Sequence, residues 1–117
     1  MSNDATVTEA VVRHHLQAFL DQKPVDDIVS DYDPDAHFIS ETKLYRGKEE
    51  IHGFFTDFIA ALPERAMERF TLTSLHVHRN IAYITWCVGS DIPLGTDTFV
   101  VHEGKILSQT FAMYAGG

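Results

Sequence analysis

The stretch GTDTFVVHEGKILSQTFAM at residues 95–113 alternates apolar and polar side chains on both sides of a short loop that contains a glycine. Alternation with a period of two is typical of β-strands. The loop at 102–104 ends in a glycine, which supplies the positive φ that a bulged hairpin turn needs. The stretch therefore predicts a β-hairpin, and the rest of the chain is interpreted around it.

The register of this hairpin brings two polar side chains together. A three-residue loop places Val101 opposite Lys105 and, further along the strands, Asp97 opposite Gln109. The more apolar face, which we expect to be the core face, holds Asp97, Phe99, Val101, Leu107, Gln109, Phe111 and Met113. A carboxylate and an amide among large apolar side chains cost free energy unless they are hydrogen-bonded, so this pattern indicates a pocket.

Length and charge set the class of protein and its partners. The 117 residues predict a single domain over 1–117, and the formal net charge of −8 disfavours a nucleic acid or an anionic membrane as partner. The N-terminus has neither the basic nor the apolar region of a signal peptide, and no apolar run is long enough to span a bilayer. We therefore expect a cytoplasmic protein.

Helical patterns occupy the first half of the chain. A capping box that begins at Thr6 predicts a first helix to about Asp21, and Pro24 suits the first turn of a second helix whose apolar stripe ends at Tyr32. The apolar face of 48–62 predicts a third helix, which Pro63 ends. Two short extended pieces are expected between the second and third helices, at 36–40 and 42–46.

From residue 66 onward the period changes to two. This pattern predicts strands at 67–79, 81–89, 96–102 and 105–114. The apolar residues of the first strand change parity near Thr73 and Ser74, which predicts a bulge that bends the sheet. Strand 81–89 is apolar on both faces, so we expect the helices to cover one face and a second subunit to cover the other. The sequence thus predicts a homodimer through the outer sheet face.

Three stretches in this order carry a resemblance to a known family. They are DIVSDYDPDA at 27–36, YRGKEEI at 45–51 and the segment 95–106. The chain resembles the SnoaL-like and ketosteroid isomerase-like branch of the nuclear transport factor 2-like superfamily. The resemblance implies an α+β fold, in which three N-terminal helices pack in a curved, mostly antiparallel β-sheet. This cone, also described as a cystatin-like α+β barrel, opens into a pocket between helices and sheet.

The resemblance also implies roles for individual residues. Asp97 falls on the protonated aspartate of ketosteroid isomerases, an enzyme whose paired acid and base are well described, and on the acid–base aspartate of SnoaL-like cyclases. Ser40 stands where the isomerase base would be, and Leu16 stands where its tyrosine would be. Gln109 lies near the position of a helper histidine in the cyclases. Steroid-isomerase chemistry is therefore not expected. For the cyclase interpretation, the aspartate is present as Asp97, but the helper histidine is replaced.

Other side chains are candidates for the pocket wall. His15 stands beside the apolar stripe of the first helix and is interpreted as a boundary histidine, although it could also reach the pocket mouth as an acid or base. Tyr32 either lines or braces the pocket through its hydroxyl or packs with that hydroxyl on backbone. The expected apolar lining is Leu16, Phe54, Phe58, Trp86, Phe99, Phe111 and Met113.

We expect neither a metal nor a cofactor. His76 and His78 share one face of a strand, a spacing that suits zinc, but the predicted bulge turns both outward and no third ligand is placed. Cys87 is the single cysteine, stands in an apolar run and is interpreted as a buried structural thiol.

Two functions remain open at this point. One is an isomerase- or cyclase-type enzyme that acts on a small apolar carbonyl compound, with Asp97 as acid–base residue and Gln109, Ser40 and Tyr32 orienting the substrate. The other is a non-catalytic ligand-binding or dimerisation module, in which Asp97 and Gln109 only fix a ligand or each other.

Overall fold

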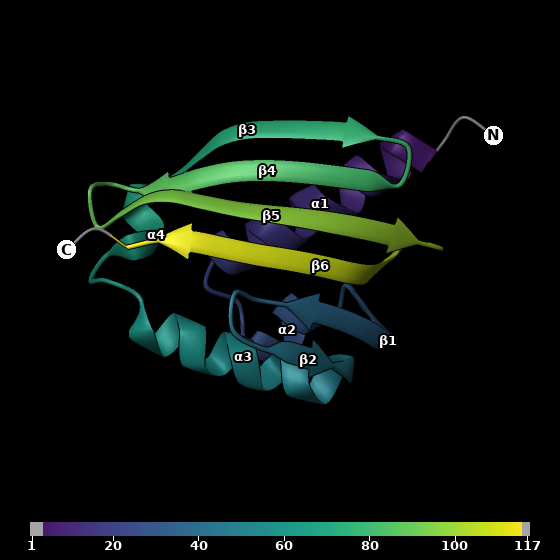
Figure 1. The fold of residues 1–117 in the computed structure, drawn as a ribbon, viewed down its shortest axis with the longest axis horizontal. Helices are drawn as coiled ribbons and strands as arrows, with labels where there is room; N and C mark the ends of the chain where they lie inside the picture. Colours follow the sequence, from purple (N-terminus) through teal and green to yellow (C-terminus); the bar gives the residue numbers. More distant parts are fainter. Residues whose placement is uncertain (1–3, 116–117) are drawn as a thin grey trace.

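The computed structural model describes residues 4–115, and within them six strands form one curved sheet in the order β2-β1-β6-β5-β4-β3 (Figure 1). Its elements along the chain are α1 (Asp4–Leu20), α2 (Val25–Val29), β1 (Tyr32–Ile39), β2 (Leu44–Arg46), α3 (Gly47–Ala61), α4 (Ala66–Arg69), β3 (Phe70–His78), β4 (Ile81–Val88), β5 (Ile92–His102) and β6 (Lys105–Tyr114). Strands β1 and β6 are parallel, and the other neighbouring strands are antiparallel.

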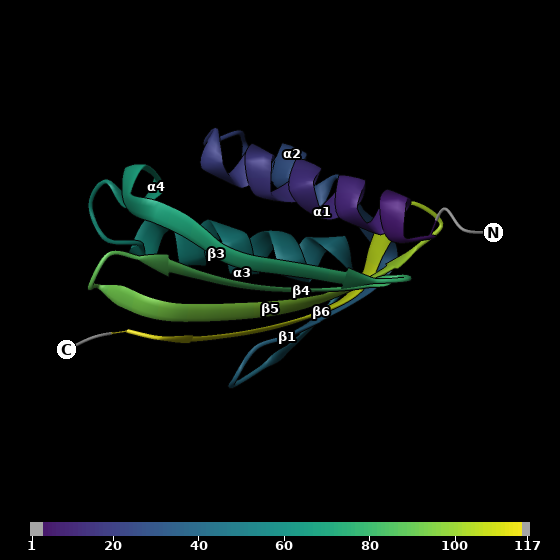
Figure 2. The ribbon, with the colours of Figure 1, turned by 90° about the horizontal axis from the view of Figure 1, so that it is seen from above.

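The helices lie together on one side of the sheet. Viewed from above, α1, α2 and α3 cover the concave face, and the short α4 stands at the end where β3 begins (Figure 2). The expected α+β class, with N-terminal helices packed in a curved and mostly antiparallel sheet, is confirmed. None of the helices within the described residues is both long and apolar enough to cross a membrane.

The helix boundaries differ in detail from the prediction. Helix α1 is already formed at Asp4, so Thr6 lies inside it and is not an N-cap. Thr8, which is buried, instead places its hydroxyl between the carbonyl oxygens of Asp4 and Arg79, either of which can accept its one proton, and this contact ties the helix to the β3–β4 turn. Tyr32 begins β1 and does not end the second helix, because the helix stops at Val29.

Strand β1 begins at Tyr32, earlier than the predicted 36–40, and from β3 onward the strands follow the prediction with two exceptions. The bulge in β3 falls between Leu72 and Ser74, as predicted. The first exception is that residues 67–69 are not extended, because they belong to α4, a single helical turn entered through the positive φ of Arg65. The second exception is that β5 begins earlier, at Ile92.

The predicted register of the 95–113 hairpin is wrong. Glu103 and Gly104 both have positive φ and form a two-residue turn between His102 and Lys105. A register shift next to Val101 then compensates on β6, where Ile106 enters the core and Leu107 is only half-buried. Asp97 therefore opposes Phe111, and Gln109 opposes Phe99. The bulge restores the parity, so Asp97 and Gln109 still share the concave face.

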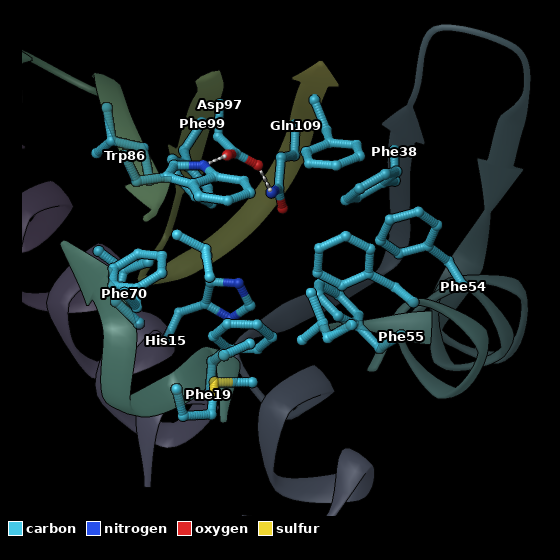
Figure 3. A pocket seen from close by; sticks show the side chains of 18 residues that line it. His15, Phe19, Phe38, Phe54, Phe55, Phe70, Trp86, Asp97, Phe99 and Gln109 are labelled. Carbon is cyan, nitrogen blue, oxygen red and sulfur yellow. Dashed lines mark hydrogen bonds between the residues drawn. The ribbon is translucent and has the colours of Figure 1, made fainter. Parts of the chain in front are cut away.

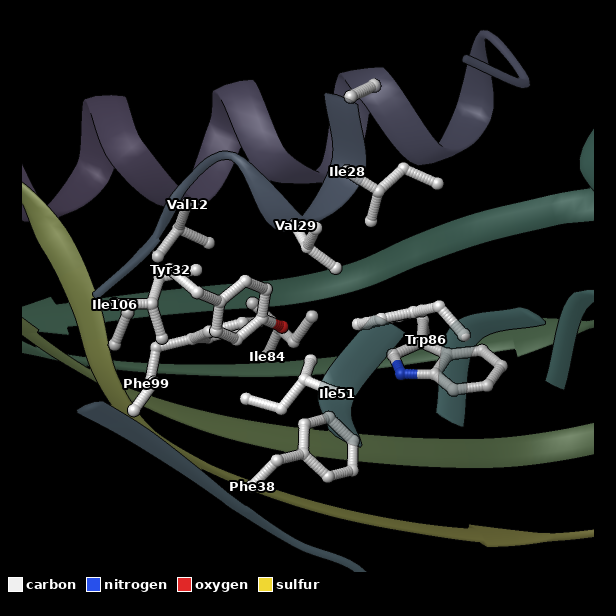
Figure 4. Close-up of a cluster of buried hydrophobic side chains, with 14 of the residues drawn as sticks. Val12, Ile28, Val29, Tyr32, Phe38, Ile51, Ile84, Trp86, Phe99 and Ile106 are labelled. Carbon is white, nitrogen blue, oxygen red and sulfur yellow. The ribbon is translucent and has the colours of Figure 1, made fainter. Parts of the chain in front are cut away.

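The core lies between the helices and this concave face (Figure 4). Its largest fully buried apolar side chains come from both layers: Tyr32, Phe38, Phe99, Ile28, Ile51, Ile84, Ile106, Val12 and Val88. The opposite face of β4 is open in the single chain, where Ile81 is 45% exposed and Tyr83 is 41% exposed. Cys87 lies on this face and is half-buried, so the prediction of a buried thiol is wrong.

Candidate active site

A cavity opens between α1, α3, α4 and the concave face of the sheet (Figure 3). Its free space is about 50 Å³, and it measures about 580 Å³ when the gaps between side chains and the open mouth are included. The wall is formed by His15, Leu16, Phe19, Phe38, Phe54, Phe55, Phe58, Leu62, Ala66, Met67, Phe70, Ile84, Trp86, Val88, Asp97, Phe99, Gln109 and Phe111. Among these lining residues, Asp97 carries the only carboxylate.

Asp97 is held on β5 by two hydrogen bonds from its neighbouring strands. Trp86 Nε1 donates to Oδ1 at 2.7 Å, and Gln109 Nε2 donates to Oδ2 at 2.8 Å. The residue is only 7% exposed, and this burial raises the pKa of Asp97 from 3.8 to about 7, against the two hydrogen bonds, which lower it. Both protonation states of the carboxyl are therefore accessible near neutral pH.

Trp86 takes this position because residue 95 has no side chain. The two residues pair across β4 and β5, and a Cβ at Gly95 would lie only 2.2 Å from Trp86 Cε2. The indole thus lies against the backbone of Gly95, with Phe70 stacked 5.5 Å from it. Sequence reasoning missed the Trp86–Asp97 bond, although a glycine inside a strand is a known sign of close approach.

Next to Asp97, a chain of buried polar groups continues along the wall of the cavity. Tyr32 Oη donates to Gln109 Oε1, and the same hydroxyl lies 3.4 Å from His15 Nε2. His15 Nδ1 in turn lies 3.3 Å from the carbonyl oxygen of Ile28. Among the described residues, no buried polar side-chain atom lacks a hydrogen-bond partner. These contacts extend from Asp97 to helix α2, and the longest of them is the 3.4 Å between Tyr32 Oη and His15 Nε2.

His15 is a buried, neutral histidine, and the prediction of a boundary position is wrong. Its side chain faces inward from α1 and is 4% exposed, and the rings of Tyr32, Phe55 and Phe99 stand edge-on to it at 5.3, 5.7 and 5.8 Å. Burial lowers the pKa of His15 from 6.5 to about 4, although the Asp31 carboxylate opposes this. The buried face of α1 includes Val12, His15 and Ala18, and the core position of a polar side chain on this face was missed.

Most of the expected lining residues meet in the cavity. The structure brings together His15, Leu16, Phe54, Phe58, Trp86, Asp97, Phe99, Gln109 and Phe111. Tyr32 is fully buried behind Gln109 and does not line the cavity, so its hydroxyl braces the site.

Two expected residues lie elsewhere. Ser40 follows the end of β1, and its hydroxyl caps the β1–β2 loop by donating to the Lys43 carbonyl and accepting from the Lys43 amide. Met113 is half-buried near the end of β6, where its backbone amide donates to Glu41. Met67 lines the cavity from α4, a contact that the predicted strand over 67–79 does not anticipate.

The remaining histidines lie outside the cavity. His76 and His78 are exposed on β3, as predicted, and His14 pairs with Asp31 at 2.9 Å on the surface. Within residues 4–115, no three histidine, cysteine or acidic side chains come close enough to hold a metal ion.

Among the described residues, the chain thus combines a curved α+β fold with a buried carboxylate in a largely aromatic cavity. The sequence profile of the SnoaL-like domain matches residues 12–109, and the chain belongs to this family. No functionally curated protein matches it.

Solved structures share the fold at low sequence identity. An NTF2-like protein of unknown function from Mesorhizobium loti is similar with a TM-score of 0.78 and 16% identity, covering 98% of this chain and 97% of its own. A Kribbella flavida protein provisionally named a ketosteroid isomerase has a TM-score of 0.73 and 15% identity, covering 97% and 82%. A de novo designed protein with a curved β-sheet reaches 0.78 and 19%, covering 97% and 88%. The designed protein shows that this backbone can exist without an evolved function, so any function must be argued from the site.

Proposed function

We propose that this SnoaL-like protein binds a small, largely apolar carbonyl compound and that Asp97 exchanges a proton with it. The observation that carries this proposal is the position of Asp97, a carboxyl of pKa about 7 at the polar end of an otherwise aromatic cavity. A general acid–base works best when its pKa lies near the operating pH. Asp97 can then take a proton from the carbon next to a carbonyl and return it elsewhere on the same molecule.

The surroundings of Asp97 favour this chemistry. Trp86 and Gln109 fix the carboxyl through one hydrogen bond on each oxygen, so a substrate meets it in a single orientation. The aromatic wall offers few hydrogen-bond partners to water, and a less polar surrounding strengthens the interaction between the carboxyl and a polarised carbonyl. Isomerisation, intramolecular aldol closure and hydration all use such an acid–base step. The provisional name of the Kribbella flavida neighbour agrees with the first of them.

The size of the cavity limits the ligand. Its free space of about 50 Å³ suits only a few non-hydrogen atoms, whereas drug-sized ligands occupy roughly 300–1,000 Å³. A larger substrate therefore requires movement of the rings near the mouth. Phe58 and Phe70 are half-buried there, and neither makes a hydrogen bond that such a movement would break.

A ligand screen followed by a turnover assay tests the proposal. Small ketones, enones and β-dicarbonyl compounds are screened by thermal shift, and each binder is then incubated with the protein while its absorbance and proton exchange are followed. Asp97→Asn should retain binding and lose turnover at least about 100-fold, the typical contribution of a general acid–base. Asp35→Asn, a change at an exposed aspartate, is the matched control and should leave turnover unchanged.

A non-catalytic binding module is the second candidate, and one observation favours it. Both oxygens of Asp97 already accept a hydrogen bond from the protein, as expected of a structural carboxylate. In this case the same screen would find compounds that bind the wild type and Asp97→Asn equally and are released unchanged.

We also propose that two copies of the chain pair through the outer face of the sheet. Ile81 and Tyr83 expose large apolar side chains there from β4, and a facing copy would bury them. Sedimentation at micromolar concentration should find a dimer, and Tyr83→Lys together with Ile81→Lys should return it to a monomer without lowering the pKa of Asp97. A wild-type monomer in the same experiment contradicts the proposal.

A further inference from the structure

The polar chain behind Asp97 contains one hydroxyl between two acceptors. Tyr32 Oη faces Gln109 Oε1 on one side and His15 Nε2 on the other, and it has a single proton to donate. Burial, with the Asp97 and Asp31 carboxylates, raises the pKa of Tyr32 well above its ordinary value, so the hydroxyl keeps that proton. Only one of its two neighbours can receive the proton at a time.

The tautomer of His15 follows from its other contact. Nδ1 lies 3.3 Å from the Ile28 carbonyl oxygen, which only accepts, so Nδ1 must carry the proton. Because His15 is neutral, Nε2 is then a bare acceptor aimed at Tyr32 Oη. In the arrangement observed, in which Tyr32 donates to Gln109, this acceptor receives no proton at normal hydrogen-bond distance.

Gln109 can connect the two ends of the chain in either direction. Its amide nitrogen and oxygen have nearly the same size, so inverting the amide changes the hydrogen bonds but not the packing. As observed, Nε2 donates to Asp97 Oδ2 and Oε1 accepts from Tyr32. This direction fits an ionised Asp97, which only accepts. A protonated Asp97 that donates through Oδ2 would need the opposite direction.

We propose that His15, Tyr32 and Gln109 are positioning residues that invert together when Asp97 gains or loses its proton. In the protonated state, Asp97 Oδ2–H donates to Gln109 Oε1, Gln109 Nε2–H donates to Tyr32 Oη, and Tyr32 Oη–H donates to His15 Nε2. One proton enters, from the substrate or from water in the cavity, and it stays on Asp97. The other hydrogens remain on their own atoms, so the amide and the hydroxyl only rotate.

This arrangement gives the protonated state one hydrogen bond that the ionised state lacks. His15 Nε2 is bonded only when Asp97 is protonated, so the relay favours protonation in addition to the effect of burial. Within residues 4–115, the groups that face the relay are Asp97 from β5, Tyr32 from β1 and His15 from α1, with the Asp31 and His14 charges acting on His15. The facing side chains from α3 and β4 are Phe55 and Trp86, which do not titrate.

The inference rests on the proposed function only for its purpose, which is to let one carboxyl act as both acid and base. The charge on Asp97 can be followed whether or not a substrate is found. Trp86 is the only tryptophan in the sequence and donates to Asp97, so its fluorescence reports the protonation of that carboxyl. A titration from pH 4 to 9 should show a midpoint near 7 that is absent in Asp97→Asn.

The decisive variant removes the acceptor at the far end. His15→Phe should lower the midpoint by about one pH unit, the equivalent of one lost hydrogen bond in the protonated state. Burial alone predicts the opposite sign, because phenylalanine makes the surroundings of Asp97 less polar. In a Tyr32→Phe background the relay is already interrupted, and His15→Phe should then no longer lower the midpoint. Phe55→Leu alters the packing around His15 but not the relay, and should leave the midpoint where it is.

A second measurement applies to the unaltered chain and does not depend on how well His15→Phe folds. The nitrogen-15 chemical shift of His15 Nε2 should move through the midpoint of Asp97 in the wild-type chain, and this movement should disappear in Tyr32→Phe. A midpoint that rises or stays constant in His15→Phe, or an Nε2 shift that titrates equally with and without the Tyr32 hydroxyl, overturns the relay. Loss of turnover in Asp97→Asn would stand in either case, so the two proposals fail separately.

Discussion

The two ends of the cavity are held in different ways. At the polar end, the side chains of Trp86, Asp97, Gln109, Tyr32 and His15 are connected by hydrogen bonds that fix distance and angle. At the mouth, half-buried rings contact one another by stacking and edge-on packing: Phe19, Phe54, Phe58 and Phe70, the last of which also stacks on Trp86.

This difference separates two tasks. Hydrogen bonds are directional, and a buried polar group that loses its partner carries a large free-energy cost, so the polar end has few alternative arrangements. Ring contacts are weaker individually and tolerate several geometries. Asp97 is thus held in place, while the aromatic part of the cavity can change its shape. Substitutions at either end test this difference.

The largest expected effect is on the pH dependence of stability. The folded state holds the Asp97 proton up to about pH 7 and the unfolded state releases it near 3.8, so this contribution is present at low pH and is lost as pH rises. The free energy of unfolding of Asp97→Asn minus that of the wild type should therefore rise by about 4 kcal/mol from pH 4 to pH 8. Urea unfolding across this range measures the difference.

His15 acts in the opposite direction. Its lowered pKa makes its contribution present above pH 6.5 and lost as pH falls toward about 4. The wild type should consequently show a flatter pH profile than Asp97→Asn, in which the His15 slope is no longer offset. Parallel profiles for the two proteins would contradict the assigned burial of Asp97.

The next largest effect is expected when the centre of the polar chain is removed. Gln109→Leu leaves Asp97 Oδ2 without its donor and Tyr32 Oη with only the distant His15 Nε2, and should lower the free energy of unfolding by about 3 kcal/mol. Gln17→Leu replaces an exposed glutamine that bonds only Asp21, and should change it by less than about 0.5 kcal/mol. Equal losses of stability in the two variants would show that the buried hydrogen bonds of Gln109 stabilise the fold no more than the exposed one of Gln17.

A smaller effect is expected from filling the space beneath the indole. Gly95→Ala forces Trp86 away from Asp97, and should cost about 2 kcal/mol of stability by overpacking. The loss of the indole hydrogen bond should also raise the pKa of Asp97 above 7, because that bond favours the ionised form. Gly53→Ala is the control, since a Cβ there meets nothing within 4 Å. NMR titration of the Asp97 carboxyl carbon measures the shift.

The smallest effect is expected at the mouth. Phe58→Leu removes a ring that contacts Phe54 and Phe111, each at 5.4 Å, and should cost about 1 kcal/mol. The pKa of Asp97 should stay unchanged, while the set of compounds that stabilise the protein in a thermal-shift screen should move toward bulkier ones. If the set of stabilising compounds stays unchanged and the pKa of Asp97 shifts, the proposed difference between the two ends is wrong.

Much of the fold could be predicted because it follows from local periodicity. The three-four spacing of apolar residues in 48–62 and the period of two in 105–114 each specify an element and its buried face. The parity change near Ser74 was sufficient to predict the bulge of β3. The hairpin register was not predictable, since a two-residue turn with a bulge and a three-residue loop both preserve which face Asp97 occupies.

The candidate site was predictable only in part, for a related reason. Alternation placed Asp97 and Gln109 on the core face, and no long-range contact was needed for that inference. Whether His15 lies at the boundary or in the core depends on how α1 crosses the sheet. Ser40 lies outside the site because β1 ends one residue before it.

The sequence by itself determined the curved α+β fold and the burial of one carboxylate, because both depend on the order of side chains along single elements. Only the tertiary structure decided what Asp97 touches. Its partners Trp86 and Gln109 come from different strands, and the groups behind them, Tyr32 and His15, come from β1 and α1. Hydrogen bonds act over about 3 Å, and positions across elements are defined to that accuracy only when the helices have packed into the sheet.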